Sequence, residues 1–158
     1  MAELTHLDAA GGARMVDVGA KAATTRSATA EGTIRMSPEA FRLVADGAVA
    51  KGDVLSVSQL AGTMAAKRTA ELIPPCHPLG LDHIEVRAVL DDAVPGVRVR
   101  ATVRTNGRTG VEMEALTAVS VALLTVYDMV KSADREMEVG PVRLLEKTGG
   151  SRGDWRRR

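Results

Sequence analysis

Several residue types are scarce in this 158-residue chain, and each scarcity excludes a class of protein. A single cysteine, Cys76, rules out an intrachain disulfide and fits a reducing cytoplasm. The aromatic residues are Phe41, Tyr127 and Trp155 alone, which argues against single-stranded nucleic-acid binding, where rings stack on bases. The formal net charge is +1, so bulk electrostatics favour neither a nucleic-acid nor a membrane partner.

Segments that direct a chain to a membrane are also missing. No apolar run approaches the roughly 20 residues that a membrane-spanning helix needs, and the first residues lack the apolar core of a signal peptide. Hydrophobic residues make up 45% of the chain, enough for an ordinary core built from Ala, Val, Leu, Ile and Met. We therefore expect one cytoplasmic domain.

The common cofactor and metal motifs are absent. There is neither a phosphate-binding Gly-Lys-Ser/Thr loop nor a dinucleotide glycine fingerprint. His6, His77 and His83 together with Cys76 give no zinc-ligand spacing. We expect no required cofactor and no dedicated metal site.

The hydrophobic patterning predicts an α+β domain. Ile84–Leu90 and Val97–Val103 alternate in polarity around a turn, which is typical of a β-hairpin. Ser37 followed by Pro38 is typical of a helix start. The predicted order is a strand at 27–36, a short helix after Ser37, a helix at 54–72, a rigid loop at 74–81, the hairpin, a long helix and a last strand at 138–146.

Without the additional helix this order is βαββαβ, a ferredoxin-like sandwich with two helices on one face of an antiparallel sheet. The other sheet face would need a cover, which suggests a partner subunit. We expect an N-terminal arm at 1–25, a single domain at 26–150 and a disordered basic tail at 151–158, whose terminal arginines are solvated.

The long helix, within Asn106–Lys131, organises the chain. It has acids in its first turn, Asp128 and Lys131 in its last, and no charge from Ala115 to Tyr127, so its middle is expected to be buried. Glu114 and Asp128 are 14 residues apart, about 21 Å along the axis. Either only one end is catalytic, or two copies run antiparallel and build composite sites across a two-fold interface.

A proline-rich loop, Pro74-Pro75-Cys76-His77-Pro78, precedes the hairpin. It is either a stiff connector or a rigid way to present His77 as a ligand contact or proton carrier. A nucleophilic pair of Cys76 and His77 is not expected, because adjacent side chains on an extended loop diverge. Cys76 is therefore expected to be a small apolar filler.

The charged helix ends each allow two interpretations. Glu112 and Glu114 either complement the helix dipole or accept hydrogen bonds from a guanine edge. Asp128 and Lys131 form either a surface ion pair or an acid/base pair in a partly dry pocket. Most lysines are expected at the surface, but Lys51 lies in a tight turn at a helix start, where anions bind.

Seven blocks of this sequence, in the right order from about Thr5 to Gly150, resemble the MoaC family of molybdenum-cofactor biosynthesis. They are Thr5-His6 with Met15-Val16-Asp17-Val18, Lys51-Gly52-Asp53, Ala66-Lys67-Arg68-Thr69, Ile73-Pro74-Pro75-Cys76-His77-Pro78-Leu79, Thr109-Gly110-Val111-Glu112-Met113-Glu114-Ala115-Leu116-Thr117, Tyr127-Asp128-Met129-Val130-Lys131 and Gly140-Pro141-Val142-Arg143-Leu144-Leu145. The chain departs from the family at Pro75, where Leu is usual, and at Val130, where Cys occurs in some comparisons.

The resemblance implies a cyclic pyranopterin monophosphate synthase, a lyase. Its substrate is (8S)-3',8-cyclo-7,8-dihydroguanosine 5'-triphosphate, made from GTP, and it releases diphosphate. It implies a ferredoxin-like subunit in a homohexamer, a trimer of dimers, with active sites at subunit interfaces. Mg²⁺ enters only as a counterion of the phosphates.

The resemblance also assigns roles to individual residues. Asp128 matches the family's catalytic acid, and Lys51 and Lys131 match the lysines that act with it. Segments of the family that bind substrate match Pro75, Cys76, His77, Met113 and Glu114, and further pocket residues match Glu112 and Lys147.

Two other functions fit the same residues. A nucleotide-binding module without turnover would bind guanine nucleotides and be indifferent to Lys51→Ala. An oligomeric scaffold would respond to Lys131→Ala in assembly or melting, with no change in ligand affinity.

Overall fold

The computed structural model describes residues 11–158. Its strands are β1 (Thr24–Arg35), β2 (His83–Asp91), β3 (Gly96–Gly107), β4 (Glu138–Val139), β5 (Arg143–Thr148) and β6 (Trp155–Arg156). Its helices are α1 (Pro38–Ala45), α2 (Val54–Ala66), α3 (Thr69–Leu72) and α4 (Glu112–Val130). Thr5 and His6, which carry part of the family resemblance, lie outside the described residues.

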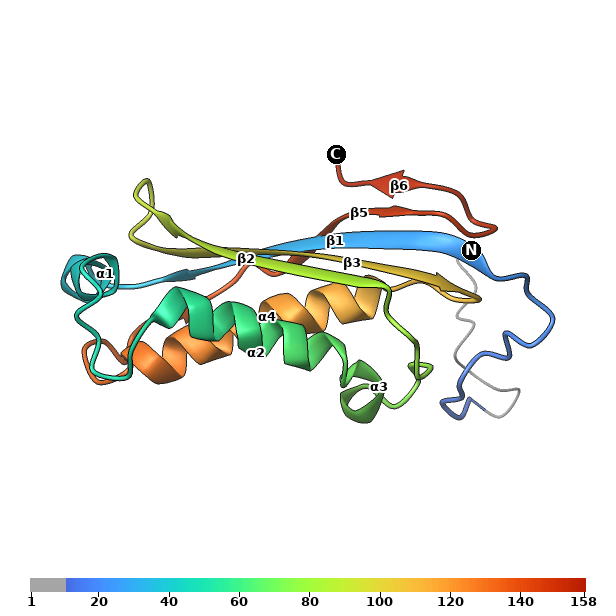
Figure 1. The fold of residues 1–158 in the computed structure, drawn as a ribbon, viewed down its shortest axis with the longest axis horizontal. Helices are drawn as coiled ribbons and strands as arrows, with labels where there is room; N and C mark the ends of the chain where they lie inside the picture. Colours follow the sequence, from blue (N-terminus) through green and yellow to red (C-terminus); the bar gives the residue numbers. More distant parts are fainter. Residues whose placement is uncertain (1–10) are drawn as a thin grey trace.

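The strands form one antiparallel sheet in the order β2-β3-β1-β5-β6, and β4 also pairs with β1. β1 and β3 pair without a break from Thr24 opposite Gly107 to Arg35 opposite Gly96. The helices α2 and α4 cover one face of the sheet (Figure 1). The order β2-β3-β1-β5 is that of a βαββαβ ferredoxin-like fold, which confirms the predicted fold class.

Side-chain caps explain where helices α1 and α2 begin. Ser37 Oγ accepts a hydrogen bond from the Ala40 N–H at 3.2 Å, and Asp53 Oδ1 accepts one from the Ser56 N–H at 3.0 Å. Each cap satisfies a backbone donor that the first helical turn leaves unpaired. Asp134, just beyond α4, accepts from the Ser37 N–H at 2.7 Å and so holds the start of α1 to the end of α4.

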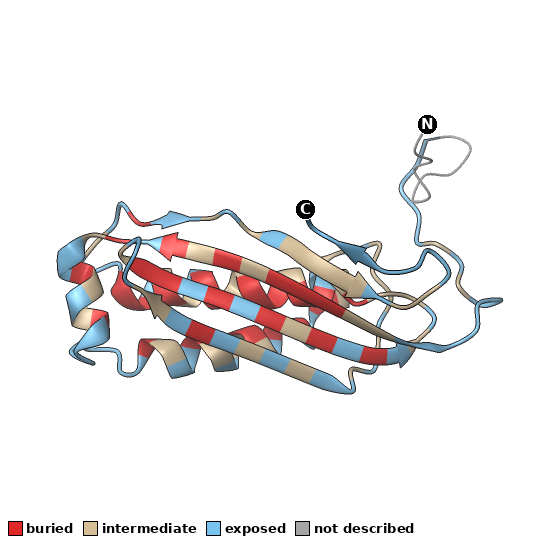
Figure 2. Cartoon of the chain, turned by 90° about the horizontal axis from the view of Figure 1, so that it is seen from above, coloured by how far each residue is buried: buried red, intermediate tan, exposed pale blue. Residues whose placement is uncertain are grey.

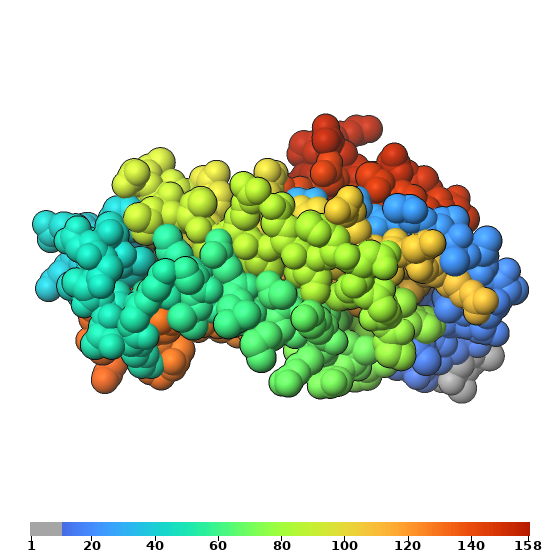
Figure 3. Space-filling view, viewed as in Figure 1, coloured from blue at the N-terminus to red at the C-terminus, as the bar shows by residue number. Residues whose placement is uncertain are grey.

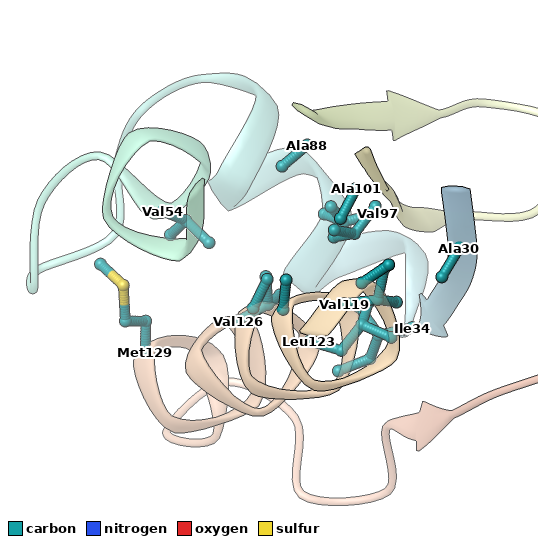
Figure 4. Packing of buried hydrophobic residues seen from close by; sticks show 14 of the residues in the cluster. Ala30, Ile34, Val54, Ala88, Val97, Ala101, Val119, Leu123, Val126 and Met129 are labelled. Carbon is teal, nitrogen blue, oxygen red and sulfur yellow. The ribbon is translucent and has the colours of Figure 1, made fainter. Parts of the chain in front are cut away.

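The core lies between the sheet and the two long helices, and aliphatic side chains fill it (Figure 4). Ile34, Leu123 and Val126 are fully buried. Small residues set the spacing of the layers, since a Cβ on Gly32 would come within 2.9 Å of Leu123 and a Cβ on Gly62 within 2.8 Å of the Ala118 carbonyl oxygen. Close packing between α2 and α4 therefore depends on Gly62.

The outer face of the sheet is polar, and the burial pattern alternates along the strands (Figure 2). The hydroxyls of Thr29 and Thr102 lie 3.0 Å apart on this face. Glu31 lies 3.8 Å from both Arg100 and Arg143. The expectation that this face needs a covering subunit therefore does not follow, because it exposes hydrogen-bonding and charged groups that water can solvate.

Two predicted elements are interrupted. The helix predicted at 54–72 ends at Ala66 and resumes as α3, because Arg68 has a non-helical backbone and the Thr69 hydroxyl donates to the Ala66 carbonyl at 3.0 Å. The strand predicted at 138–146 is divided into β4 and β5 around Pro141, which has no N–H to donate to the sheet.

The prediction of a disordered tail at 151–158 is wrong in part, because two of its residues form a strand. Residues Trp155 and Arg156 form β6, which pairs with Lys147 and Glu146 of β5. The Arg157 N–H extends this contact by donating to the Leu145 carbonyl at 2.8 Å. The prediction missed this strand because pairing with β5, and not the composition of the tail, gives it an extended backbone.

Helix α4 has the length and hydropathy of a membrane span, with 19 residues, so the expectation that no apolar run approaches this length is wrong. No other helix among the described residues passes this test. Helix α4 is also the central core helix, and 56% of its apolar window is buried inside the domain. Glu112, Glu114 and Asp128 lie within it, and Ala115, Ala118, Ala122 and Val126 are buried in the core. Its apolar character is therefore explained by packing against the sheet and α2.

Candidate active site

The first cluster of site residues lies at the C-terminal end of α4. Lys51 Nζ donates to Asp128 Oδ2 at 2.7 Å and to the Asp128 carbonyl oxygen at 2.8 Å. Lys131 Nζ donates to Asp128 Oδ1 at 2.6 Å. The turn before α2 thus supplies Lys51 to the end of α4, and one carboxylate is held between two ammonium groups.

This arrangement makes Asp128 a strong acid. The hydrogen bond from Lys131, followed by that from Lys51, lowers the pKa of Asp128 from 3.8 to about 2. Asp128 is therefore a carboxylate throughout the neutral range and cannot itself donate a proton there. The two lysines are the available donors.

The cluster is more exposed than the sequence indicates. The side chains of Lys51, Asp128 and Lys131 are 49%, 58% and 51% exposed. In the last turn of α4, Met129 and Val130 are buried, whereas Asp128 lies on the exposed side of the helix. The single chain therefore does not by itself form the partly dry pocket of the acid/base interpretation. Ion pairs as exposed as these contribute little to folding stability.

The second cluster lies at the N-terminal end of α4, against the proline-rich loop. Two adjoining hollows of about 410 Å³ and 300 Å³ share His77, Thr109, Gly110 and Glu112. All six predicted binding residues of the loop and helix start line the larger hollow: Pro75, Cys76, His77, Glu112, Met113 and Glu114. Lys147 lines the smaller hollow, and its Nζ lies 3.9 Å from Glu112 Oε1.

Burial sets the electrostatics of this end. Glu114 is only 4% exposed, and burial raises its pKa, with a smaller contribution from the charge of Glu112. Burial also raises the pKa of Cys76, to which the charge of Glu114 adds. Cys76 is therefore a protonated thiol in the neutral range, which disfavours a role as a nucleophile. It is half-buried and lines the larger hollow.

Gly110 makes room for the Glu112 carboxylate. A Cβ at position 110 would overlap Glu112 Oε2, so any other residue there would displace that side chain. The loop that precedes α4 thus leaves space for the carboxylate in the hollow that His77 and Lys147 also line.

The smaller hollow also contains basic residues that sequence reasoning missed. They are Lys21, Arg26, Arg108 and Arg152. Arg26 Nε donates to the Gly107 carbonyl oxygen at 2.9 Å. A signal for Arg26 is present in the sequence, because it shares the helix-facing side of β1 with Ala28 and Ala30, where a charged residue is unexpected. Lys21 and Arg152 carry no such signal.

The two clusters do not meet within one chain. None of Lys51, Asp128 and Lys131 lines either hollow, and the length of α4 separates the two ends (Figure 1). Glu112 and Asp128 are 16 residues apart on the helix, about 24 Å along its axis. One substrate can contact both clusters only if they come from different subunits.

Within residues 11–158, no group of three or more His, Cys, Asp or Glu side chains is placed to hold a metal ion. The two clusters and the smaller hollow present ammonium, guanidinium, imidazole and carboxylate groups. Such groups bind phosphates, recognise a base edge and transfer protons.

Comparison with known proteins identifies relatives along almost the whole chain. A family model described as the MoaC family matches residues 15–150. A protein of Methylobacterium sp. (strain 4-46) named cyclic pyranopterin monophosphate synthase is 62% identical over 155 residues, which cover 98% of this chain and 97% of the relative. A Brucella ovis protein with the same name is 58% identical over 153 residues, covering 97% and 93%.

Proposed function

Because the chain belongs to the MoaC family, we propose that it forms cyclic pyranopterin monophosphate, the compound in the names of its relatives, in molybdenum cofactor biosynthesis. The substrate is the cyclised guanosine triphosphate derivative that the family resemblance implies. Release of diphosphate makes the protein a phosphorus–oxygen lyase. With one cysteine, the chain suits the cytoplasm, where we place it.

The observation that carries the proposal is Asp128 held between Lys51 and Lys131 at 2.7 and 2.6 Å. Two ammonium groups on one exposed carboxylate form a site that a phosphate can enter by replacing the carboxylate as their partner. When the phosphates take these contacts, Asp128 loses the two hydrogen bonds that lower its pKa and becomes a better base.

We assign the ring-closing step to this end of α4. A sugar hydroxyl attacks the α-phosphorus and loses its proton, and the bond from that phosphorus to the bridging oxygen breaks, so diphosphate leaves with the electron pair. Asp128 accepts the proton. Lys51 and Lys131 stabilise the charge that builds on the phosphate oxygens. Lys131 also donates protons during the opening and closing of the base rings.

We assign recognition of the purine-derived rings to the other end of α4. Glu112, Glu114 and His77 offer acceptors and a titratable ring around one hollow. The burial of Glu114 supports a role in reading a base edge, because an enclosed carboxyl rejects a ligand that leaves it unpaired. Lys147 and Arg26 bind phosphate oxygens, and any Mg²⁺ that accompanies the substrate is a counterion.

The separation of the two ends supports assembly. We propose that two subunits place their α4 helices so that the Asp128 end of one completes the His77 end of the other, within the homohexamer that the resemblance implies. Exposed apolar residues of α2 and α4, among them Leu60, Met64 and Leu124, offer surface for such contacts.

The test is a turnover assay with the cyclised substrate, measuring both the pterin product and diphosphate. We expect Asp128→Asn to lower the turnover rate by about 10²-fold or more with no change in melting temperature. Asp92→Asn, an exposed acid in the hairpin turn, is the matched control and should retain wild-type turnover. Wild-type turnover by Asp128→Asn would rule out the assigned role.

A further inference from the structure

A second basic region lies on the outer face of the sheet, remote from α4. Six arginines line a hollow of about 740 Å³ there, together with two glutamates. The arginines come from β2, β3, β5 and the C-terminal tail: Arg87, Arg100, Arg143, Arg156, Arg157 and Arg158. We call this hollow the arginine face.

The carboxylates near the arginine face do not neutralise it. Arg87 is paired with Glu85 at 2.8 Å, and Arg156 with Glu146 at 2.7 Å. Arg100 and Arg143 share the single carboxylate of Glu31, each at 3.8 Å, beyond good hydrogen-bond distance. Guanidinium donors therefore outnumber the acceptors, which leaves the hollow positively charged although the chain as a whole carries only +1.

The tail is fixed on this face by its backbone. Strand β6 pairs with β5, and Asp154 Oδ1 accepts from the Gly149 N–H at 2.9 Å in the turn between them. Arg157 Nε donates to the Leu144 carbonyl oxygen at 2.9 Å. The tail (red) rises above the sheet at the top of the space-filling view (Figure 3). The terminal arginines, which the sequence suggests are solvated, thus form one wall of a hollow.

We propose that the arginine face binds an anion that contains a diphosphate group, either inorganic diphosphate or the phosphate chain of a nucleoside triphosphate. Guanidinium forks bind phosphate oxygens two at a time, and arginines from three strands and the tail can contact successive phosphates. The volume is that of a small-molecule site. No aromatic side chain lines the hollow, so stacked single-stranded nucleic acid is a poor fit.

This site does not depend on the proposed reaction, because it lies on the sheet face opposite α4 (Figure 2). The experiment is titration calorimetry at constant ionic strength with inorganic diphosphate and, separately, with a nucleoside triphosphate. It uses the full chain carrying Lys51→Ala and Lys147→Ala, which removes one proposed phosphate contact at each end of α4 and so weakens anion binding there. Sulfate at equal ionic strength is the reference anion.

We expect saturable binding of diphosphate or of the nucleoside triphosphate, and weak binding of sulfate. Adding Arg100→Gln and Arg157→Gln should weaken the binding of diphosphate or of the nucleoside triphosphate. The expected loss is roughly tenfold or more in affinity for each arginine, the usual loss for a charge-assisted hydrogen bond. The matched control adds Arg42→Gln and Arg135→Gln, which are exposed elsewhere, and should not change it. Binding of the triphosphate alone would identify a nucleotide as the ligand, and binding of both anions would identify the diphosphate group.

Three results would overturn the proposal: no binding, equal affinity for sulfate, or equal loss in the Arg42/Arg135 control. A change of assembly state in Arg100→Gln/Arg157→Gln, with anion binding intact, would also overturn it and make the face a subunit contact. If that variant fails to fold, Arg87→Gln with Arg158→Gln tests the same hollow from its other walls.

Discussion

The two ends of α4 carry opposite kinds of site. At its C-terminal end, Asp128 is exposed and saturated with charge, held by two lysines at 2.7 and 2.6 Å. At its N-terminal end, Glu114 is 4% exposed, and its pKa is affected more by burial than by the charge of Glu112. Lysines lower the pKa of the first acid, and burial raises the pKa of the second.

The difference separates two tasks that one helix serves. An enclosed end with shaped hollows suits recognition, because buried polar groups reject ligands that cannot pair with them. An exposed, charged end suits phosphate chemistry, but water screens its charges until something covers it. Under the proposed function, the open end therefore needs a substrate and a second subunit to exclude water from it.

The largest expected effect comes from mixing two inactive variants. Asp128→Asn damages only the open end, and Glu112→Ala together with His77→Ala damages only the enclosed end. If sites are composite, a dimer of one variant with the other has one intact site, so dissociation and reassociation of the mixture should recover about a quarter of wild-type turnover. The turnover assay measures this recovery directly.

Each variant alone, taken through the same dissociation and reassociation, is the control and should stay inactive. A mixture that stays inactive while sedimentation shows mixed oligomers would contradict the composite site. Both clusters would then serve separate ligands within each subunit.

Substitution of single lysines should distinguish the two ends kinetically. Lys147→Gln, at the enclosed end, should raise KM by roughly tenfold with kcat retained, since it removes a charged contact made equally in the ground and transition states. Lys131→Gln, at the open end, should lower kcat by about 10²-fold, because it removes transition-state charge stabilisation. Steady-state kinetics with Lys67→Gln, an exposed lysine beyond α2, as control will separate the two. The reverse pattern would exchange the roles of the two ends.

The sequence predicts the elements whose pattern is local. Neighbouring residues were enough to predict the β2–β3 hairpin and the start of α1 at Ser37. Alternating polarity indicates the hairpin, and the Ser-Pro pair indicates the helix start. Strand β6 was not predictable, since it depends on pairing with β5. The break at Arg68 is local, where the Thr69 hydroxyl donates to the Ala66 carbonyl, but the sequence pattern predicted one helix across it.

The site shows the same division. The sequence suggests a site at each end of α4 and the proline-rich loop, and the structure brings the loop residues to the helix start. The exposure of Asp128 was not predictable, because the uncharged run of α4 indicates burial on average and does not show which side of the last turn is open. Met129 and Val130 next to Asp128 are buried. Lys21 and Arg152 line the smaller hollow because of the paths of the segments before β1 and after β5, which no short sequence pattern predicts.

A smaller effect is expected on stability at the enclosed end. Burial favours the protonated form of Glu114, so its pKa is higher in the folded chain. The stability that this form contributes is complete below the unfolded pKa and is lost as pH rises through the folded pKa. Glu114→Gln, neutral at every pH, should therefore raise the Tm near neutral pH by about 2–4 °C, which corresponds to about 1 kcal/mol in a domain of this size.

Melting curves from acid to neutral pH test this, with Glu136→Gln as an exposed control that should show no pH-dependent difference. The Tm advantage of Glu114→Gln should vanish at acid pH, where Glu114 is already protonated. An advantage that persists unchanged at low pH would mean that packing, and not charge, is responsible.

The smallest effect is expected at the open end, where charge is exposed. The two lysines lower the pKa of Asp128 from 3.8 to about 2. Any stability that this carboxylate contributes is therefore present above pH 3.8 and is lost as pH falls from there through about 2. Carboxyl NMR should show the pKa of Asp128 rising toward 3.8 in Lys131→Ala and, to a smaller degree, in Lys51→Ala. Little change in Tm should accompany this rise, because exposed ion pairs stabilise the fold weakly. A large fall in Tm in either variant would mean that the cluster is a structural clamp, and the contrast between the two ends of α4 would then be one of folding and not of chemistry.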